Sequence, residues 1–233
     1  MFHVEQFYVT QMFMTLDKLS NGAKQLGFPL SEDEARRFEL YLAELLKWNA
    51  KVNLTAITEP DGIRIKHFLD SLALLGILPP GRLSRFTACD IGSGAGFPGL
   101  ALKIVLPEMD ITLVEPARKK AAFLRHVIRT LGLSGANVLE EAAGAASGRT
   151  VLAPFSFDVV FSRAFKSFAE LLPLAGPLLT GGGYVAQNLS LKDAGGSIAR
   201  SRSTGPGWEI EREEVITLPF SDIGRRLMLL RKI

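Results

Sequence analysis

The sequence predicts an α/β fold in which a mostly parallel, doubly wound sheet follows an N-terminal helical extension. From Phe86 onward, short apolar runs alternate with helical patterns in the order strand, loop, helix, strand. This alternation is typical of parallel sheets with helices on both faces. Before Phe86 the patterns are helical, and Pro79-Pro80-Gly81 interrupts them. We therefore expect a helical extension at residues 1–80 and the sheet domain at residues 81–233.

Two helices are expected in the N-terminal part. Ser31 and Glu34 match a capping box before a helix that ends near Trp48, with an apolar face of Phe38, Leu42, Leu45 and Leu46. Asp61 is placed to cap a second helix, which would carry Lys66, His67, Asp70 and Ser71. Between the two helices, the asparagines of W-N-A-K-V-N-L-T favour local backbone hydrogen bonds. Residues 1–27 are expected to form one irregular helix or an ordered arm.

Seven apolar runs predict the strands of the sheet. The first ends at Asp90, and the others are expected at residues 111–114, 137–139, 157–161, 184–187, 214–218 and 227–230. A helix at residues 168–179 and a turn at Gly181-Gly182-Gly183 are expected before the fifth strand. Residues 188–207 contain glycines and arginines and predict a surface loop.

The first strand runs into a glycine-rich turn that opens a helix. Asp90 is followed within nine residues by four glycines, Gly92, Gly94, Gly96 and Gly99. Glycine accepts positive φ and lets a ligand approach the backbone closely. Pro98 suits the first turn of the following helix, because its missing N–H would have no partner there. We therefore expect this loop to hold a nucleotide-like ligand.

The surroundings of the loop decide between two nucleotide classes. Gly94, Gly96 and Gly99 satisfy G-x-G-x-x-G, a dinucleotide fingerprint that is weak by itself. Asp90 would repel a pyrophosphate but attract the α-ammonium of S-adenosyl-L-methionine. Glu115 ends the next apolar run, where an acid hydrogen-bonds ribose hydroxyls. This D-x-G-x-G-x-G pattern followed by an acid favours a class I methyltransferase over a dinucleotide enzyme or a purely structural turn.

Composition excludes several other classes of protein. Hydrophobic residues make up 47% of the chain, and the net charge is only +3, so affinity for nucleic acid must come from local patches. The single cysteine, Cys89, excludes a disulfide framework and is expected to be a small buried residue. Three histidines far apart in sequence predict no metal site. The start of the chain lacks a basic segment and no apolar run reaches membrane-span length, so we expect a soluble, cytoplasmic protein.

Arg163 is the sharpest candidate outside the glycine turn. It follows the fourth strand, at the edge where open α/β sheets bind ligands. A guanidinium there can stack on a base or hold a carboxylate or phosphate. We favour this site over a structural ion pair.

Two further groups are more ambiguous. His67 and Asp70 would lie one helical turn apart, close enough to hydrogen-bond, and we favour an anchor between helix and core over catalysis. Residues 116–139 hold five Lys/Arg and no Asp/Glu. They would suit a phosphate backbone, but solvated helix charge is the favoured interpretation.

Four segments occur in an order that resembles one known family. They are W-N-x-x-x-N-L-T, K-H-x-x-D-S-L, D-I-G-S-G-A-G-F-P-G and S-R-A. Together they are similar to the GidB/RsmG family of bacterial 16S ribosomal RNA (guanine-N7) methyltransferases. The resemblance implies a Rossmann-like methyltransferase fold, S-adenosyl-L-methionine as cofactor, and 16S ribosomal RNA or the small ribosomal subunit as partner. It also implies that Gly92 and Phe97 contact the cofactor and that Arg163 lies in the cofactor and substrate site.

The chain departs from the family pattern at two places. Gly144-Ala145-Ala146 stands where the family has R-x-E, so only backbone contacts to the adenine are expected from Ala145 and Ala146. Gln187-Asn188 replaces Lys-Gly, and Lys192 is a candidate substitute for the lysine. These losses keep a non-catalytic RNA-binding module open as an alternative, beside a dinucleotide-dependent oxidoreductase.

Methylation of guanine N7 would set modest chemical demands. N7 carries a lone pair and no proton, so attack on a sulfonium methyl group needs no general base. Catalysis would then depend on aligning the two reactants. We therefore expect Arg163 to position the substrate and not to transfer a proton, and we expect the protein to be a monomer.

Overall fold

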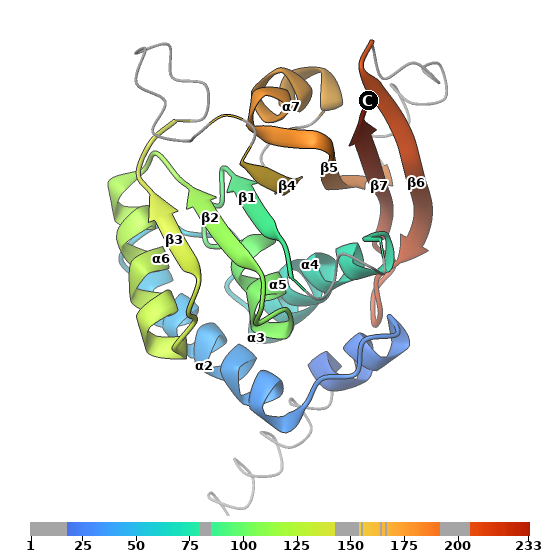
Figure 1. Ribbon diagram of the computed structural model, residues 1–233. Coiled ribbons are helices and arrows are strands. Elements are labelled where there is room, and N and C mark those ends of the chain that lie inside the picture. The colour runs from blue at the N-terminus through green and yellow to red at the C-terminus, as the bar shows by residue number, and fades with distance from the viewer. Residues whose placement is uncertain are drawn as a thin grey trace, which may run out of the picture.

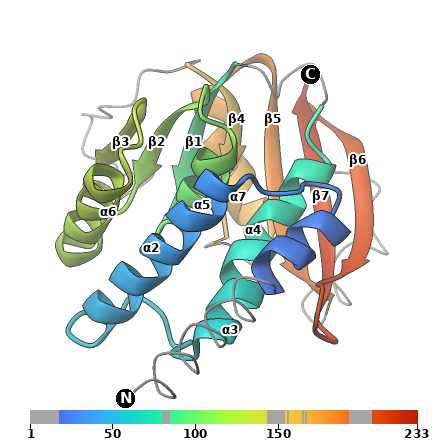
Figure 2. The ribbon, with the colours of Figure 1, turned by 90° about the horizontal axis from the view of Figure 1, so that it is seen from below.

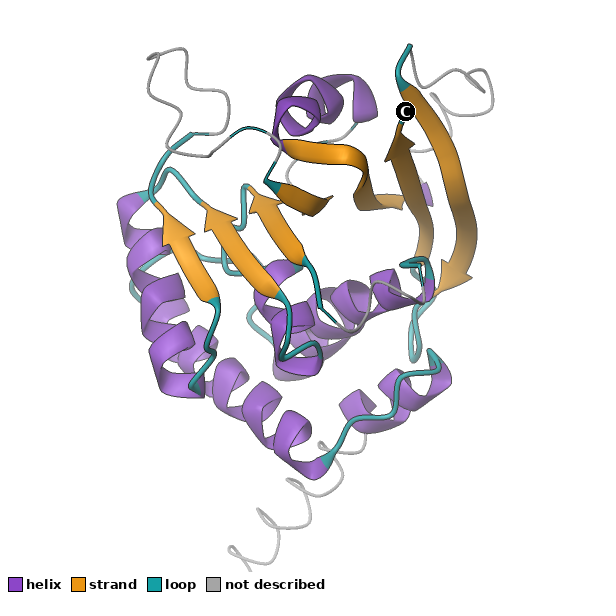
Figure 3. Ribbon diagram, viewed as in Figure 1, coloured by secondary structure: helices purple, strands orange, loops and turns teal. Residues whose placement is uncertain are grey.

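A seven-stranded sheet forms the centre of the molecule in the computed structural model, which describes residues 18–79, 85–142, 154, 156–163, 165, 167–191 and 206–233. The strand order is β3-β2-β1-β4-β5-β7-β6 (Figures 1 and 3). The first five positions pair in parallel, and β7 is antiparallel to both of its neighbours. The strands are β1 (Thr87–Ile91), β2 (Asp110–Val114), β3 (Ala136–Leu139), β4 (Phe157–Phe161), β5 (Leu179–Ser190), β6 (Trp208–Thr217) and β7 (Gly224–Lys232). The predicted α/β class with a mostly parallel sheet is confirmed.

Helices cover both faces of this sheet unequally. One face carries α2 (Glu32–Asn49), α4 (Asp70–Leu72), α5 (Gly99–Val105) and α6 (Arg118–Leu131), and the other carries α7 (Phe168–Ala175) with η4 (Gly176–Leu178) (Figures 1 and 2). A composite helix leads into α4 through α3 (Pro60–Ile63) and the π-helical η1 (Arg64–Leu69), and it continues as the 3-10 segment η2 (Ala73–Gly76). Residues 18–25 form a further helix.

The N-terminal helices share one hydrophobic core with the sheet. The capping box of α2 forms as expected, since the Ser31 N–H donates to Glu34 at 2.7 Å and the Glu34 N–H donates to Ser31 Oγ at 3.3 Å. Phe38, Leu42 and Leu45 are buried, and Tyr41 joins them. These side chains cluster with apolar residues of α5, β2 and α6. The division of the chain at residue 80 stays a prediction.

Several local predictions were wrong for identifiable reasons. Asp61 does not cap the composite helix, because Glu59 is the N-cap and Pro60 takes the first position. Gly181–Gly183 is no turn before β5. It lies inside the strand as a bulge, since the register jumps from Phe157↔Leu179 to Val159↔Tyr184. Gly182 takes a φ of 73° there, which only glycine adopts easily.

The observed ends of several other helices and strands differ from the predicted ones. Helix α7 ends at Ala175, short of the predicted 179, because Pro177 follows in a Gly-Pro pair that disfavours further α-helix. Pro98 is the N-cap of α5 and lies just before its first turn. Strands β6 and β7 are longer than predicted, because both continue through charged residues that the apolar pattern omitted. β6 is an edge strand, where such residues are well tolerated. The predictions for residues 1–17, Pro80-Gly81, Ala145, Ala146 and Lys192 fall outside the described residues.

Candidate cofactor and substrate site

The candidate site lies where the strand order reverses. β1 pairs with β2 on one side and with β4 on the other, so the connections from β1 and β4 leave the sheet in opposite directions. Open α/β sheets bind ligands in the crevice that forms at such a point, outside the carboxyl ends of the strands. Ser162 Oγ donates to the Ile91 carbonyl at 2.8 Å and fixes the two strand ends together. The glycine turn and Arg163 follow from these two ends.

The glycine turn is held by strand β2. Gly92 and Ser93 both donate their N–H groups to the Val114 carbonyl, at 2.9 and 3.1 Å. Gly92, Gly94 and Gly96 have φ values of 72°, 59° and 93°, so the expected left-handed conformations are present. The sequence requirement for glycine is therefore conformational at all three positions.

The glycines nevertheless differ in what surrounds them. A Cβ on Gly96 would lie 2.4 Å from the Tyr41 hydroxyl, and one on Gly99 would lie 2.6 Å from Leu113 Cδ2. A Cβ on Gly94 meets only the Gly92 carbonyl oxygen, at 3.9 Å. Packing therefore explains Gly96 and Gly99, whereas Gly94 faces open space at the ligand edge.

Asp90 lies fully buried beneath this turn. Its Oδ2 accepts the Gly99 N–H at 3.0 Å, which supplies a partner for the start of α5. Its Oδ1 is buried and has no hydrogen-bond partner among the described residues. Burial raises the pKa of the Asp90 carboxyl to about 7, against the lowering effect of the Gly99 N–H. A cationic donor that reached Oδ1 would satisfy this oxygen and favour the ionised carboxylate.

Glu115 braces the turn in a way that sequence reasoning missed. Its Oε2 accepts the Gly94 N–H at 2.9 Å, and its Oε1 accepts the Ala117 N–H at 2.8 Å. Each carboxylate oxygen has a further lone pair, so these bonds leave acceptor capacity for ribose hydroxyls. The ribose contact of Glu115 stays a prediction.

Phe97 stands at the end of the turn in an aromatic cluster. Its ring stacks on His67 at 4.6 Å between centroids and on Tyr41 at 5.5 Å. The Tyr41 hydroxyl donates to the Ala95 carbonyl, so the helical part of the chain holds the turn directly. Tyr41 was not singled out from the sequence, where it reads only as one more apolar position of α2.

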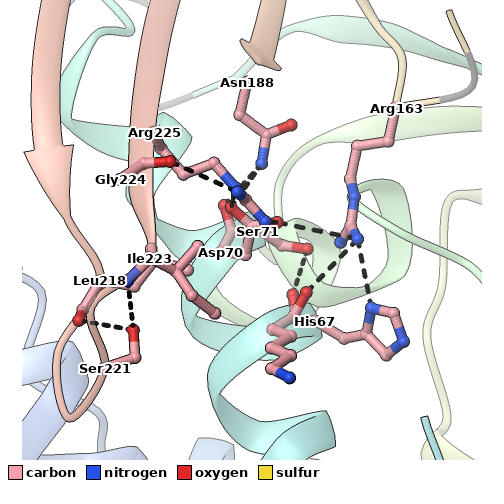
Figure 4. A network of polar contacts seen from close by, with 11 residues as sticks. His67, Asp70, Ser71, Arg163, Asn188, Leu218, Ser221, Ile223, Gly224 and Arg225 are labelled. Carbon is pink, nitrogen blue, oxygen red and sulfur yellow. Dashed lines mark hydrogen bonds and ion pairs between the residues drawn. The ribbon is translucent and has the colours of Figure 1, made fainter. Parts of the chain in front are cut away.

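Arg163 is held on one side and free on the other. Its Nη2 donates to His67 Nδ1 at 3.2 Å and to the Lys66 carbonyl at 3.4 Å, and it lies 3.7 Å from Asp70 Oδ2 (Figure 4). Its Cζ lies 5.7 Å from the centroid of the Phe97 ring. The other terminal nitrogen, Nη1, is buried and has no hydrogen-bond partner among the described residues. The guanidinium is thus oriented by the protein with one donor left over.

His67 acts as a neutral acceptor in this arrangement. A guanidinium can only donate, so His67 Nδ1 must accept, and the ring proton lies on Nε2, 2.7 Å from Thr55 Oγ1. Burial and the nearby Arg163 lower the pKa of His67 to about 3. The sequence places His67 and Asp70 within hydrogen-bonding reach of each other, but the two side chains have other partners. Residues 64–69 are π-helical, so the spacing of an α-helix does not apply.

Asp70 instead joins three distant segments. Its Oδ1 accepts Arg225 Nε from β7 and Asn188 Nδ2 from β5, both at 2.8 Å, while Oδ2 faces Arg163 (Figure 4). Its side chain is 2% exposed. Asp70 thus connects the helix to the sheet, as the anchoring interpretation expects, although its partners are other than expected. No local pattern predicts that Asn188 and Arg225 contact Asp70, because they are 118 and 155 residues away in sequence.

Part of the basic stripe on α6 is paired within the protein. Arg125 contacts Glu140 at 2.9 Å, and Arg129 lies 3.4 Å from His126 Nδ1. His126 in turn contacts Glu44 of α2 at 2.7 Å. These contacts favour the interpretation of this stripe as ordinary helix-surface charge.

Comparison with known proteins identifies the family. A protein-family model described as rRNA small subunit methyltransferase G matches residues 34–192 of this chain. The chain belongs to this family. A Ribosomal RNA small subunit methyltransferase G from Myxococcus xanthus (strain DK1622) is 38% identical over 216 residues, 93% of this chain and 96% of that protein. One from Bacillus subtilis (strain 168) is 31% identical over 221 residues, 94% of this chain and 91% of that protein.

Solved structures share the fold. TrmN from Thermus thermophilus has a TM-score of 0.53 at 19% identity and covers 70% of this chain and 49% of that chain. A predicted O-methyltransferase from Agrobacterium tumefaciens has a TM-score of 0.55 at 23% identity and covers 70% of this chain and 80% of that chain. Membership of the methyltransferase G family confirms the resemblance seen in the motifs and removes the dinucleotide-dependent oxidoreductase as an alternative.

The described residues were compared with the requirements of a membrane-spanning helix and of a metal site. None of their helices is both long enough and apolar enough to cross a membrane. No group of three or more His, Cys, Asp or Glu side chains in that part of the chain is arranged to hold a metal ion.

Proposed function

We propose that this protein transfers the methyl group of S-adenosyl-L-methionine to N7 of a guanine in 16S ribosomal RNA. The relatives are named as small subunit rRNA methyltransferases. The observation that carries the proposal is the buried, unpartnered oxygen of Asp90 in the same glycine turn whose Gly94 faces open space. A carboxylate and a bare backbone at the β1 and β4 ends suit a ligand with a cationic amine.

The residues present fit the cofactor. Asp90 Oδ1 would accept the α-ammonium, and the turn of Gly92, Gly94 and Gly96 would lie against the cofactor, with open space for it at Gly94. Glu115 would hold the ribose with its remaining lone pairs. Phe97 is fixed by the rings of His67 and Tyr41 and would form one wall. Bound there, the cofactor supplies an electrophilic methyl group on a sulfonium sulfur. Backbone contacts from Ala145 and Ala146 to the adenine remain part of the proposal.

Three titratable side chains that the structure describes at the site, those of His67, Tyr41 and Cys89, are not suited to remove a proton. His67 is neutral, and its Nδ1 lone pair is occupied by Arg163. Burial raises the pKa of Tyr41 well above its usual value. It also raises the pKa of the buried Cys89 thiol, so that this cysteine is no ready nucleophile. This set of groups suits guanine N7, which has a lone pair and no proton to lose.

Arg163 is the positioning residue of the proposed reaction. Positive charge passes from sulfur to the purine, so a nearby guanidinium gains nothing by charge alone. It contributes by holding O6 or a phosphate with its free Nη1 while Nη2 stays fixed to His67. The reaction then gains from alignment of nucleophile, methyl group and sulfur. The proposal includes a monomer that acts in the cytoplasm, where small ribosomal subunits are made.

The decisive experiment mixes the purified protein with methyl-labelled S-adenosyl-L-methionine and either naked 16S ribosomal RNA or small subunits that lack the modification. Label in the RNA, at a position where N7-methylguanine permits strand scission, is the expected result. RNA binding with no label in either substrate would indicate the non-catalytic module instead. Light scattering of the same preparation tests the monomer.

A further inference from the structure

Asn188 stands at the place where this chain departs from the Lys-Gly of its family, and the structure gives its side chain a defined orientation. Its Nδ2 donates to the Asp70 backbone carbonyl at 3.1 Å and to Asp70 Oδ1 at 2.8 Å. Both partners are acceptors, so the nitrogen must be on that side and the oxygen on the other. Asn188 Oδ1 is buried and has no hydrogen-bond partner among the described residues.

This unpartnered acceptor and the unpartnered donor of Arg163 belong to two side chains that contact the same residue, Asp70. Figure 4 shows the Asn188 oxygen on the side of its amide that faces Arg163, and both side chains are tied to Asp70. Buried polar atoms in folded proteins nearly always have a hydrogen-bond partner. Arg163 Nη1 and Asn188 Oδ1 are therefore one donor and one acceptor that a ligand could satisfy together.

The order of the strands matches the order of groups on guanine. The cofactor loop follows β1, Arg163 follows β4, and Asn188 lies near the end of β5, with neighbouring strands about 4.8 Å apart. Along the edge of guanine, N7 is followed by the O6 acceptor and then by the N1–H donor. With N7 directed at the methyl group, O6 reaches a donor at β4 and N1–H reaches an acceptor at β5.

We infer that Asn188 is a specificity-determining residue that accepts the N1–H of the target guanine while Arg163 donates to its O6. This inference rests on the proposed function. Adenine would present an N6 amine to the Arg163 donor and an N1 lone pair to the Asn188 acceptor, and both contacts would be repulsive. The arrangement therefore selects guanine, although the methylated atom, N7, exists in both purines.

The test uses RNA in which the mapped target nucleotide is guanosine, inosine or 1-methylguanosine. Inosine keeps N7, O6 and N1–H, whereas 1-methylguanosine has lost N1–H. The wild-type protein should methylate inosine within about threefold of guanosine and 1-methylguanosine about tenfold more slowly, the scale of one hydrogen bond. In Asn188→Leu this tenfold preference should fall to about twofold, with cofactor affinity unchanged by calorimetry.

Two variants guard against a structural effect. Asn188→Ala removes the same acceptor without filling its space and should lose the same preference. Asn137→Leu makes the matched change on the exposed edge strand β3 and should keep it. Equal rates on guanosine and 1-methylguanosine with the wild-type protein would overturn the inference. So would an Asn188→Leu protein that slows both substrates equally. Failure of the proposed function is distinct, because the wild-type protein would then label no RNA at all.

Discussion

The glycine turn after β1 and the Asp70 network beyond β4 occupy the same edge of the sheet, but they are built from different materials. The turn is backbone: three positive-φ glycines held by the Val114 carbonyl and by Glu115. The network is side-chain charge: Asp70 shared between two arginines and an amide. A site built from backbone binds its ligand by shape, so an added side chain should abolish ligand binding. A network of charged side chains orients the groups it holds, so a change of charge or geometry should disturb that orientation. Substitutions should therefore separate cofactor binding from transfer.

The largest expected effect is at the turn. Gly94→Val should abolish cofactor binding and leave the fold intact, because its side chain would enter the open space at the ligand edge. The positive φ adds strain of about 1 to 2 kcal/mol. Calorimetry with S-adenosyl-L-methionine and thermal melts would measure the two effects separately.

Gly132→Val is the matched control, because Gly132 has a φ of 63° and no atom within 4 Å of its would-be Cβ. It should show a similar loss of stability with normal cofactor binding. Retained binding in Gly94→Val would move the cofactor away from this turn.

The second largest effect is expected from a substitution that disturbs the Asp70 network and leaves the glycine turn intact. Arg163→Lys keeps the charge but loses the planar fork, which contacts His67 with one nitrogen and leaves the other free. Transfer to RNA should fall by more than about tenfold while cofactor affinity stays unchanged. Arg231→Lys, on an exposed ion pair of β7, provides the matched control. A variant at Arg163 with full transfer activity would mean that the guanidinium has no positioning role.

These two regions also differ in how far the sequence determines them. The turn is local, so the spacing of glycines and acids in one short stretch predicts its strand, its left-handed backbone and its ligand edge. The network depends on Asn188 and Arg225, which reach Asp70 only after the sheet has formed, with β7 inserted beside β5. The π-helical segment at residues 64–69 has no sequence period of its own, so the positions of His67 and Asp70 were read with α-helical spacing.

A third change tests whether Glu115 serves the ligand as well as the turn. Glu115→Ala removes the acceptor of the Gly94 and Ala117 N–H groups and should weaken cofactor binding by about 1 to 3 kcal/mol. Glu140→Ala, at the surface pair with Arg125, should leave affinity unchanged. Unaltered affinity in Glu115→Ala would place the ribose elsewhere and leave Glu115 with a bracing role alone.

Asp90 gives the turn a pH dependence that the network lacks. Since the pKa of its carboxyl is raised to about 7, the group is protonated below that pH in the cofactor-free protein. An ammonium ligand prefers the carboxylate, so affinity should fall by about tenfold per pH unit below pH 7 and level off above it. Asp90→Asn should bind weakly and without this slope. A wild-type affinity that is constant from pH 5.5 to 8.5 would contradict the contact with the ammonium.

The stability of the cofactor-free protein should follow the opposite direction. The folded state keeps the Asp90 proton up to about pH 7, whereas the unfolded chain releases it near 3.8, the ordinary pKa of an aspartate side chain. The unfolded state therefore binds fewer protons between these values, and folding loses stability as pH rises, by up to about 4 kcal/mol. Asp90→Asn should raise the melting temperature more at pH 8 than at pH 4.

The smallest expected effect is that of pH on the single-turnover rate at saturating cofactor, and it tests the network. At saturating cofactor the Asp90 carboxyl should stay ionised, and the proposed chemistry requires no general base. His67 cannot supply one, because its pKa lies near 3 and Arg163 occupies its free lone pair. The single-turnover rate should therefore be nearly flat between about pH 6.5 and 9. In Arg163→Lys the single-turnover rate should be lower at every pH and equally independent of pH, because the lysine changes the alignment of the reactants and not their protonation. A wild-type rate that rises tenfold per unit across this window would indicate a nucleophile that loses a proton first, and guanine N7 would no longer be the methylated atom.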